Sequence, residues 1–217
     1  SITLALPQGK QSLMEQTRGN FRINLNRNKK PGDSQPMFDR GIISTPDNPD
    51  TQYELKLWAY TDKHGRSFYA GPSSIAATDA SALERANALM QQQAADMDTG
   101  AVKPDGPLQL AEHQVMLFPN GFKIAQNDAR YAALTDEDKA LNDRRPEVWG
   151  YWNPGNGAAQ LRIAAWDMPG RYGPFLGGNT QYPQPGKNIA VEAQPDAPAA
   201  GAKAAPKSKG RSSDPAR

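Results

Sequence analysis

Hydrophobic and polar residues alternate over several short stretches of the chain, which predicts mostly β structure. Phe21, Ile23 and Leu25 alternate with polar neighbours, the period of a half-buried strand. The same period recurs over residues 53–60. A glycine-containing turn at 62–65 and a returning stretch at 67–70 complete a predicted hairpin.

Two other patterns interrupt the β signal. Over residues 79–97 the spacing becomes helical, and Ser81 and Glu84 have the form of a capping box. A second helix is predicted within 127–141, with Thr135 able to cap its second half. Between them, Asn120-Gly121 separates two hydrophobic runs, 115–118 and 122–124, and predicts a further hairpin.

These elements predict an α+β, mostly β protein with two small OB-like or β-barrel units and one or two short helices. Residues 1–98 form an N-terminal β unit with a trailing helix, and the Gly/Pro-rich stretch 99–107 is a linker. Residues 108–187 form a C-terminal β unit that resembles the first. Residues 188–217 are rich in Ala, Pro and Lys, and we expect a basic disordered tail there.

The two predicted units share one sequence element. Leu55–Gly71 and Leu161–Gly177 each contain an alternating strand, a turn followed by Gly-Arg, and an aromatic residue shortly before a glycine. The match requires one deletion and one insertion. Duplication of a small β domain explains it, and so does convergence, because any two amphipathic hairpins share these features.

The repeated strands predict a binding surface on their non-core side. Leu55, Leu57 and Leu161, Ile163 face a core, so basic and aromatic residues fall together on the other side. Bases of a single strand stack on aromatic rings while Lys and Arg contact phosphates. The candidate nucleic-acid-binding residues are Lys56, Trp58, Tyr60, Arg66, Arg162, Trp166 and Arg171. The alternative is that this aromatic side forms a second core, with the cations extending past it.

Composition removes several classes of function. The chain has no cysteine, so thiol nucleophiles and cysteine-based metal sites are excluded. The two histidines lie far apart, and neither a P-loop nor Gly-x-Ser-x-Gly occurs. We therefore expect no enzyme, catalytic residue, metal or cofactor. No apolar run is long enough to span a bilayer, and a cytoplasmic protein without membrane contact is expected.

One resemblance adds to this interpretation. Asn28-Lys-Lys-Pro-Gly, Gln35-Pro-Met-Phe38 and Gly65-Arg-Ser-Phe-Tyr69, with the strand between them, resemble the small β-rich proteins of phages and plasmids. Several of those are single-stranded DNA-binding proteins with an OB-like fold. Bacterial proteins of that function usually end in an acidic tip, whereas this sequence ends Ser213-Asp-Pro-Ala-Arg217.

Together these features predict a non-specific single-stranded nucleic-acid-binding protein, with DNA favoured over RNA, accessory to phage or plasmid replication, protection or transfer. The net charge of only +2 requires the affinity to come from local patches. The rival is a protein–protein interaction module, such as a mobile-element inhibitor, that uses the same aromatics as interface anchors. The oligomeric state stays open.

Overall fold

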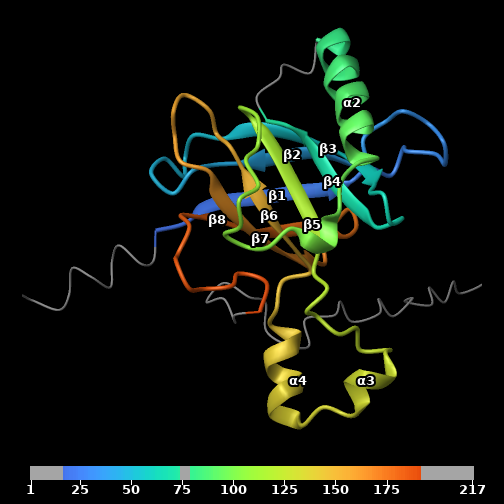
Figure 1. Ribbon diagram of the computed structural model, residues 1–217, viewed down its shortest axis with the longest axis vertical. Helices are drawn as coiled ribbons and strands as arrows, with labels where there is room; N and C mark the ends of the chain where they lie inside the picture. Colours follow the sequence, from blue (N-terminus) through green and yellow to red (C-terminus); the bar gives the residue numbers. More distant parts are fainter. Residues whose placement is uncertain (1–16, 74–78, 192–217) are drawn as a thin grey trace, which may run out of the picture.

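Eight antiparallel strands, arranged in sequence order, form a barrel that closes where the last strand pairs with the first (Figure 1). The computed structural model describes residues 17–73 and 79–191. The strands are β1 Gly19–Leu25, β2 Phe38–Ile43, β3 Tyr53–Thr61, β4 Ser67–Pro72, β5 Gln114–Pro119, β6 Val148–Trp152, β7 Leu161–Met168 and β8 Phe175–Gln181. The closing ladder runs from Gly19 opposite Thr180 to Asn24 opposite Phe175. Closure leaves no free sheet edge.

The inside of the barrel is filled by side chains, as an eight-stranded barrel allows. The inward residues are those predicted from the alternation, including Ile23, Leu55, Leu57 and Ile163, each at most 1% exposed. Trp152 closes one end of this inner cluster. Its ring lies 5.5 Å from that of Tyr53, and its Nε1 donates to Ser73 Oγ.

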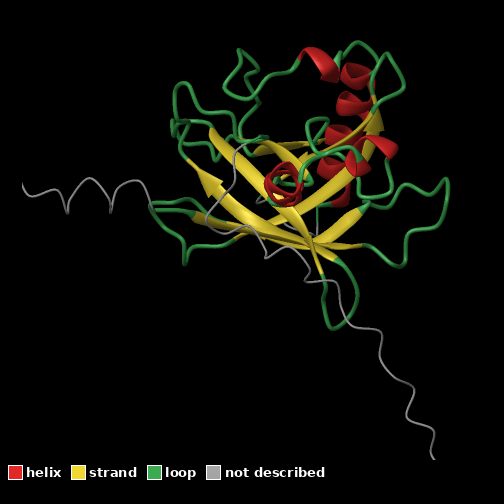
Figure 2. Ribbon diagram, turned by 90° about the horizontal axis from the view of Figure 1, so that it is seen from below, coloured by secondary structure: helices red, strands yellow, loops and turns green. Residues whose placement is uncertain are grey.

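A second buried layer covers the outside of β3 to β7. A chain of ring contacts runs across these strands, from Tyr60 through Phe68 and Phe118 to Trp149 and Tyr151. Helix α2 (Ala80–Ala94), residues from Met97 to Leu110 and the segment around Ile189 lie over it. Figure 2 shows the barrel from below, with the helices and long loops that leave it.

The connections lie at two ends of the barrel, because each strand reverses direction. The loops 26–37, 62–66 and 169–174 and the β5–β6 connection lie at one end, named here the loop end. The β5–β6 connection carries the short helices α3 (Ala129–Ala132) and α4 (Asp136–Asp143), which form a lobe beside the barrel (Figure 1). The β4–β5 connection, which contains α2, leaves β4 at the opposite end, but its 3-10 helix η1 (Thr99–Ala101) lies at the loop end, where Thr99 contacts the β3–β4 turn.

Two helices begin close to where the sequence places them. The carboxylate of Asp79 accepts from Ala82 N and caps α2, two residues before Ser81 of the predicted capping box. Thr135 caps α4, as predicted, by accepting from Asp138 N.

The predicted hairpin at Asn120-Gly121 is wrong. Asn120 instead anchors the start of the lobe, because its side-chain amide donates to Pro146 O and its Oδ1 accepts from Phe122 N. Residues 122–124 lie alongside Asn142 of α4, whose side chain bonds both backbone polar groups of Ile124. A side chain thus supplies the partners that a returning strand would have offered.

The two predicted β units do not form separate barrels. Each contributes four strands to one barrel, and this topology differs from the five-stranded Greek-key barrel of the OB type. Both copies of the repeated element are hairpins, β3–β4 and β7–β8. Their registers differ, however, since Tyr60 pairs with Phe68 whereas Trp166 pairs with Gly177.

The predicted linker and tail also take part in packing. Val102 and Leu108, within and next to the 99–107 stretch, pack against the outer cluster. Ile189 and Ala190, at the start of the predicted tail, are 1% and 0% exposed. Residues 192–217 of that tail lie outside the described residues. Within the described ranges, no helix has the length and apolar character needed to cross a bilayer.

Gly150 of β6 offers a test of strand contact in the barrel. A Cβ at this position would lie 1.9 Å from the carbonyl oxygen of Met116, a backbone atom of the neighbouring strand β5. We therefore expect Gly150→Ala to lower the free energy of unfolding by about 1–3 kcal/mol or more in urea titrations. Gly121→Ala, where no atom lies within 4 Å, is the control and should leave it nearly unchanged. Equal stability of the two variants would contradict this packing.

Candidate nucleic-acid interface

The predicted site residues lie on two walls of the barrel rather than on one face. Lys56, Trp58 and Tyr60 point outward from β3, and Arg162 and Trp166 point outward from β7, as the alternation predicted. In an eight-stranded closed barrel, strands four positions apart stand on opposite sides. The two sets therefore do not form a common surface.

Three of the predicted residues are buried and belong to the second core. Tyr60, Arg162 and Trp166 are 4%, 1% and 1% exposed. The Tyr60 hydroxyl donates to Asn87 Oδ1 of α2, and burial raises its pKa. Trp166 Nε1 donates to Arg144 O at 3.2 Å. For these positions the second-core alternative is correct, because covering segments occupy the space that a ligand would need.

Arg162 fixes two of those covering segments. Its Nη1 donates to Asp105 Oδ2 at 2.9 Å and to Lys187 O at 3.1 Å. A buried arginine needs such partners, since removing one partner of a buried pair costs about 3–5 kcal/mol. Its role is to hold the chain around residues 105 and 187 on the barrel.

Arg66 lies at the loop end, where it serves the β3–β4 turn. Its guanidinium pairs with Asp98 at 3.0 Å, and its backbone N–H donates to Asp62. The Asp62 carboxylate also accepts from His64 N and from the backbone N–H and hydroxyl of Thr99. Burial acts to raise the pKa of Asp62, but these hydrogen bonds outweigh it and hold the pKa well below its usual value.

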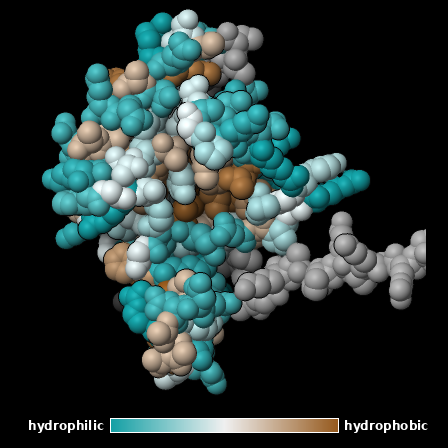
Figure 3. Space-filling view, turned by 90° about the vertical axis from the view of Figure 1, so that its right-hand side faces the viewer, coloured by the Kyte–Doolittle hydropathy of each residue, from teal (hydrophilic) through white to brown (hydrophobic). Residues whose placement is uncertain are grey.

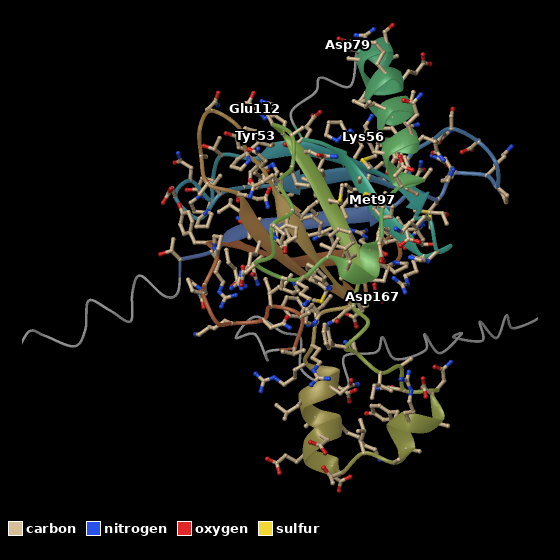
Figure 4. The ribbon with its side chains drawn as sticks, in the orientation of Figure 1. Tyr53, Lys56, Asp79, Met97, Glu112 and Asp167 are labelled. Carbon is tan, nitrogen blue, oxygen red and sulfur yellow. The ribbon has the colours of Figure 1, made fainter. Side chains whose placement is uncertain are left out.

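Lys56 and Trp58 are partly exposed. Lys56 lines a surface hollow of about 430 Å³ between β2 and β3, beside α2 (Figure 4). Trp58 follows it on the same side of the strand, and its Nε1 donates to Ser34 O at 3.0 Å. That bond fixes the orientation of the indole while part of its surface stays open.

The strongest basic–aromatic contact involves residues absent from the predicted set. The guanidinium carbon of Arg22 on β1 lies 3.9 Å from the centre of the Phe175 ring on β8. The β1–β8 ladder brings the two together. A Cβ on Gly170 or on Gly177 would lie 2.9 Å from this ring, so the glycines leave the space that Phe175 fills.

The β7–β8 turn extends this contact toward the loop end. Arg171 lies 5.5 Å from the centre of the Tyr172 ring, and Tyr172 is 72% exposed. The guanidinium of Arg27 lies against Gly173, the next residue of the turn. We name the set Arg22, Arg27, Arg171, Tyr172 and Phe175 the arginine–aromatic cluster. Within the described parts of the chain, none of its three arginines has a carboxylate within 4 Å.

The cluster continues around the barrel into an open wall. This wall consists of the outward residues Arg22, Phe175, Arg40, Ile42, Glu54 and Lys56, from β8, β1, β2 and β3. The described covering segments lie over the other half of the barrel. Figure 3 shows the molecule from the right-hand side of Figure 1, with hydrophobic residues toward the middle of the face and hydrophilic ones around them.

The groups on this surface are suited to non-covalent contacts. Arginine guanidinium groups bind phosphate, and exposed rings stack on planar groups. Among the residues that the structure describes, no three His, Asp or Glu side chains are grouped as metal ligands. Comparisons with protein families, with curated proteins and with solved structures found no significant match. The function must therefore be argued from this geometry.

The depressed pKa of Asp62 gives a pH test of the β3–β4 turn. The ionised Asp62 carboxylate should contribute fully to the free energy of unfolding above its unfolded-state pKa of about 4. This contribution should be lost as the pH falls below that value. Asp62→Asn should lower the free energy of unfolding at pH 7, because an amide nitrogen cannot accept the two hydrogen bonds from Thr99 and the remaining amide oxygen carries no charge. In urea titrations, the difference in the free energy of unfolding between wild type and variant should become smaller from pH 5 to pH 2.5.

The control for this test is Glu84→Gln, which neutralises an exposed carboxylate of α2 that has no hydrogen-bond or ion-pair partner within the described ranges. It should change stability by less than about 0.5 kcal/mol at any pH. If the difference in the free energy of unfolding between wild type and Asp62→Asn stays constant over the same pH range, the role given to the carboxylate is contradicted.

Proposed function

We propose that the protein binds single-stranded nucleic acid, without sequence preference, along the open wall and the arginine–aromatic cluster, and that DNA is the usual ligand. The observation that carries the proposal is the grouping of three arginines, each without an acidic partner in the described chain, with two rings, one of them 72% exposed. Cations without acidic partners beside open rings are what a strand of phosphates and bases requires.

Each group has a distinct part in this mode. Arg27 and Arg171 contact phosphates at the loop end, and Tyr172 stacks on a base. The guanidinium of Arg22 is already held flat on Phe175, so little side-chain entropy is lost when it pairs with a phosphate or stacks on a base. Lys56 extends the cationic path around the barrel, and Arg40 beside it is paired with Asp39 at 3.5 Å.

The wall also carries acidic groups, which limits the expected affinity. Asp39 and Glu54 line the same hollow as Arg40 and Lys56. Together with a net charge of +2, they favour modest binding with strong salt dependence rather than the tight binding of a polycation.

Of the residues predicted from the sequence, Lys56, Trp58 and Arg171 keep a direct role in this proposal. Tyr60, Arg162 and Trp166 support the fold, and Arg66 is engaged by Asp98. We also propose an accessory function in phage or plasmid replication, protection or transfer. This part of the proposal rests on the resemblance of the first half of the chain to small β-rich proteins of phages and plasmids.

A protein–protein interaction module is the second candidate, and the lobe favours it. Phe122 and Leu141 are 51% and 47% exposed on the β5–β6 connection. Two large apolar side chains on one projecting lobe are typical of an interface anchor. This lobe is distinct from the cluster, so substitutions in one should not affect binding by the other.

The proposal predicts that the double variant Arg22→Ala/Arg171→Ala binds labelled oligo-dT on the order of tenfold more weakly at about 0.1 M salt. Two lost phosphate contacts should also reduce the slope of log K against log salt by about 1.4. Fluorescence anisotropy across a salt series measures both quantities.

The matched control is Arg66→Ala/Arg130→Ala, which removes the same charge from arginines already paired with Asp98 and Asp128. It should lower affinity by less than threefold. No binding of oligo-dT by the wild-type protein at low salt, or equal loss in both double variants, would contradict the proposed interface.

A further inference from the structure

A second hollow lies next to the open wall, under α2. It has a volume of about 230 Å³, and its walls are largely apolar, with Trp58 and Pro72 on the barrel side and Ala86, Leu89 and Met90 on the helix side. Pro72 also lines the hollow that contains Lys56. The two hollows are therefore neighbours, and Lys56 and Trp58 connect them along one side of β3.

This hollow also carries polar groups without partners in the described chain. The side-chain oxygen of Asn87 accepts from Tyr60, whereas its amide nitrogen and the side chains of Gln93 and Glu112 have no hydrogen-bond partner among the described residues. His113 Nδ1 is buried without a hydrogen-bond partner. A pocket of apolar walls with a few convergent polar groups is the usual form of a small-molecule site.

From this combination we infer that the hollow accepts one unpaired nucleobase of the bound strand, stacked on Trp58. A base is flat and mostly apolar on its faces, which suits the indole and Leu89. Its edge carries donors and acceptors, which suits Glu112, Asn87 and Gln93, because carboxylates accept from exocyclic amines and amides pair with ring edges. A purely apolar ligand would leave those groups unpaired.

The position of Lys56 supports the same occupant. Lys56 and Trp58 are two residues apart on one strand, so their side chains leave β3 about 7 Å apart on the same side. A phosphate at Lys56 can therefore belong to the nucleotide whose base enters the hollow. This inference rests on the proposed function for the path of the strand, but the hollow itself can be tested without any phosphate.

The test uses adenosine, which has no phosphate, as the probe and intrinsic fluorescence as the readout. Trp149, Trp152 and Trp166 are 4%, 0% and 1% exposed, so the partly open Trp58 is the indole that a soluble ligand can reach. Adenosine should quench part of the tryptophan emission in the wild-type protein. Ala86→Phe, which fills the hollow from α2, should reduce adenosine affinity at least tenfold, and Trp58→Leu should abolish the quenching.

The control variant is Ala88→Phe, which adds the same ring to an exposed position of α2 that does not line the hollow. It should bind adenosine as the wild type does. In oligo-dT binding, Ala86→Phe should weaken affinity about tenfold with no change in salt slope, since a stacked base and not a phosphate contact is lost. Circular dichroism of each variant confirms that the fold is retained.

The outcomes separate the two proposals. No adenosine binding by the wild type, or equal binding by Ala86→Phe and Ala88→Phe, overturns the base pocket whether or not oligo-dT binds. Adenosine binding that Ala86→Phe removes, in a protein that does not bind oligo-dT, supports the pocket and contradicts the strand-binding function. Binding of both ligands, each weakened by Ala86→Phe, supports both.

Discussion

The outer aromatic layer on β3 to β7 is the constraint on which the rest of the structure depends. Tyr60, Phe68, Phe118, Trp149 and Trp166 face away from the barrel interior, and each is at most 4% exposed. Large aromatic rings on the outside of a barrel are removed from water only when other segments of the chain cover them. Helix α2, the residues after it and the segment near Ile189 provide that cover.

This covering determines where a ligand can bind. The covering segments lie over one half of the barrel and leave open the outward residues of β1 and β2 and, on β8, the ring of Phe175. The open half carries the smaller and more polar residues, among them Asn20, Arg22 and Asn24 on β1. The candidate interface is thus the part of the barrel surface that the second core does not need.

Alternation predicted the strands and the inward residues well, because burial of one face imposes a period of two. It could not say which outward faces are covered. Arg162 has the same place in its strand as Lys56, yet Arg162 is buried and Lys56 is partly open. The difference comes from segments far away in sequence, near residues 105 and 187.

The hairpin predicted at Asn120-Gly121 shows the same limit. These two residues are typical of a hairpin turn, but the side chain of Asn142 forms the hydrogen bonds to Ile124 that a returning strand would have formed.

The arginine–aromatic cluster was missed for a similar reason. The pattern places Arg22 on the outward face of its strand, between Phe21 and Ile23, but its partner Phe175 is brought to it by the ladder between the first and last strands. No local signal reports that pairing. The unusual glycine content around Phe175, with Gly170 and Gly177 against its ring, is the one sequence feature that could have indicated a ring held on the surface.

The closing ladder also has a consequence for synthesis. Gly19 and Thr180 pair across almost the whole described chain, so β1 remains without its second neighbour until β8 has left the ribosome. During that time the half barrel of β1 to β4 exposes two unpaired edges and the faces of both cores. Folding dominated by such long-range pairing is slow. The nascent chain therefore keeps apolar surface and strand edges exposed to water until the second half of the barrel has been translated.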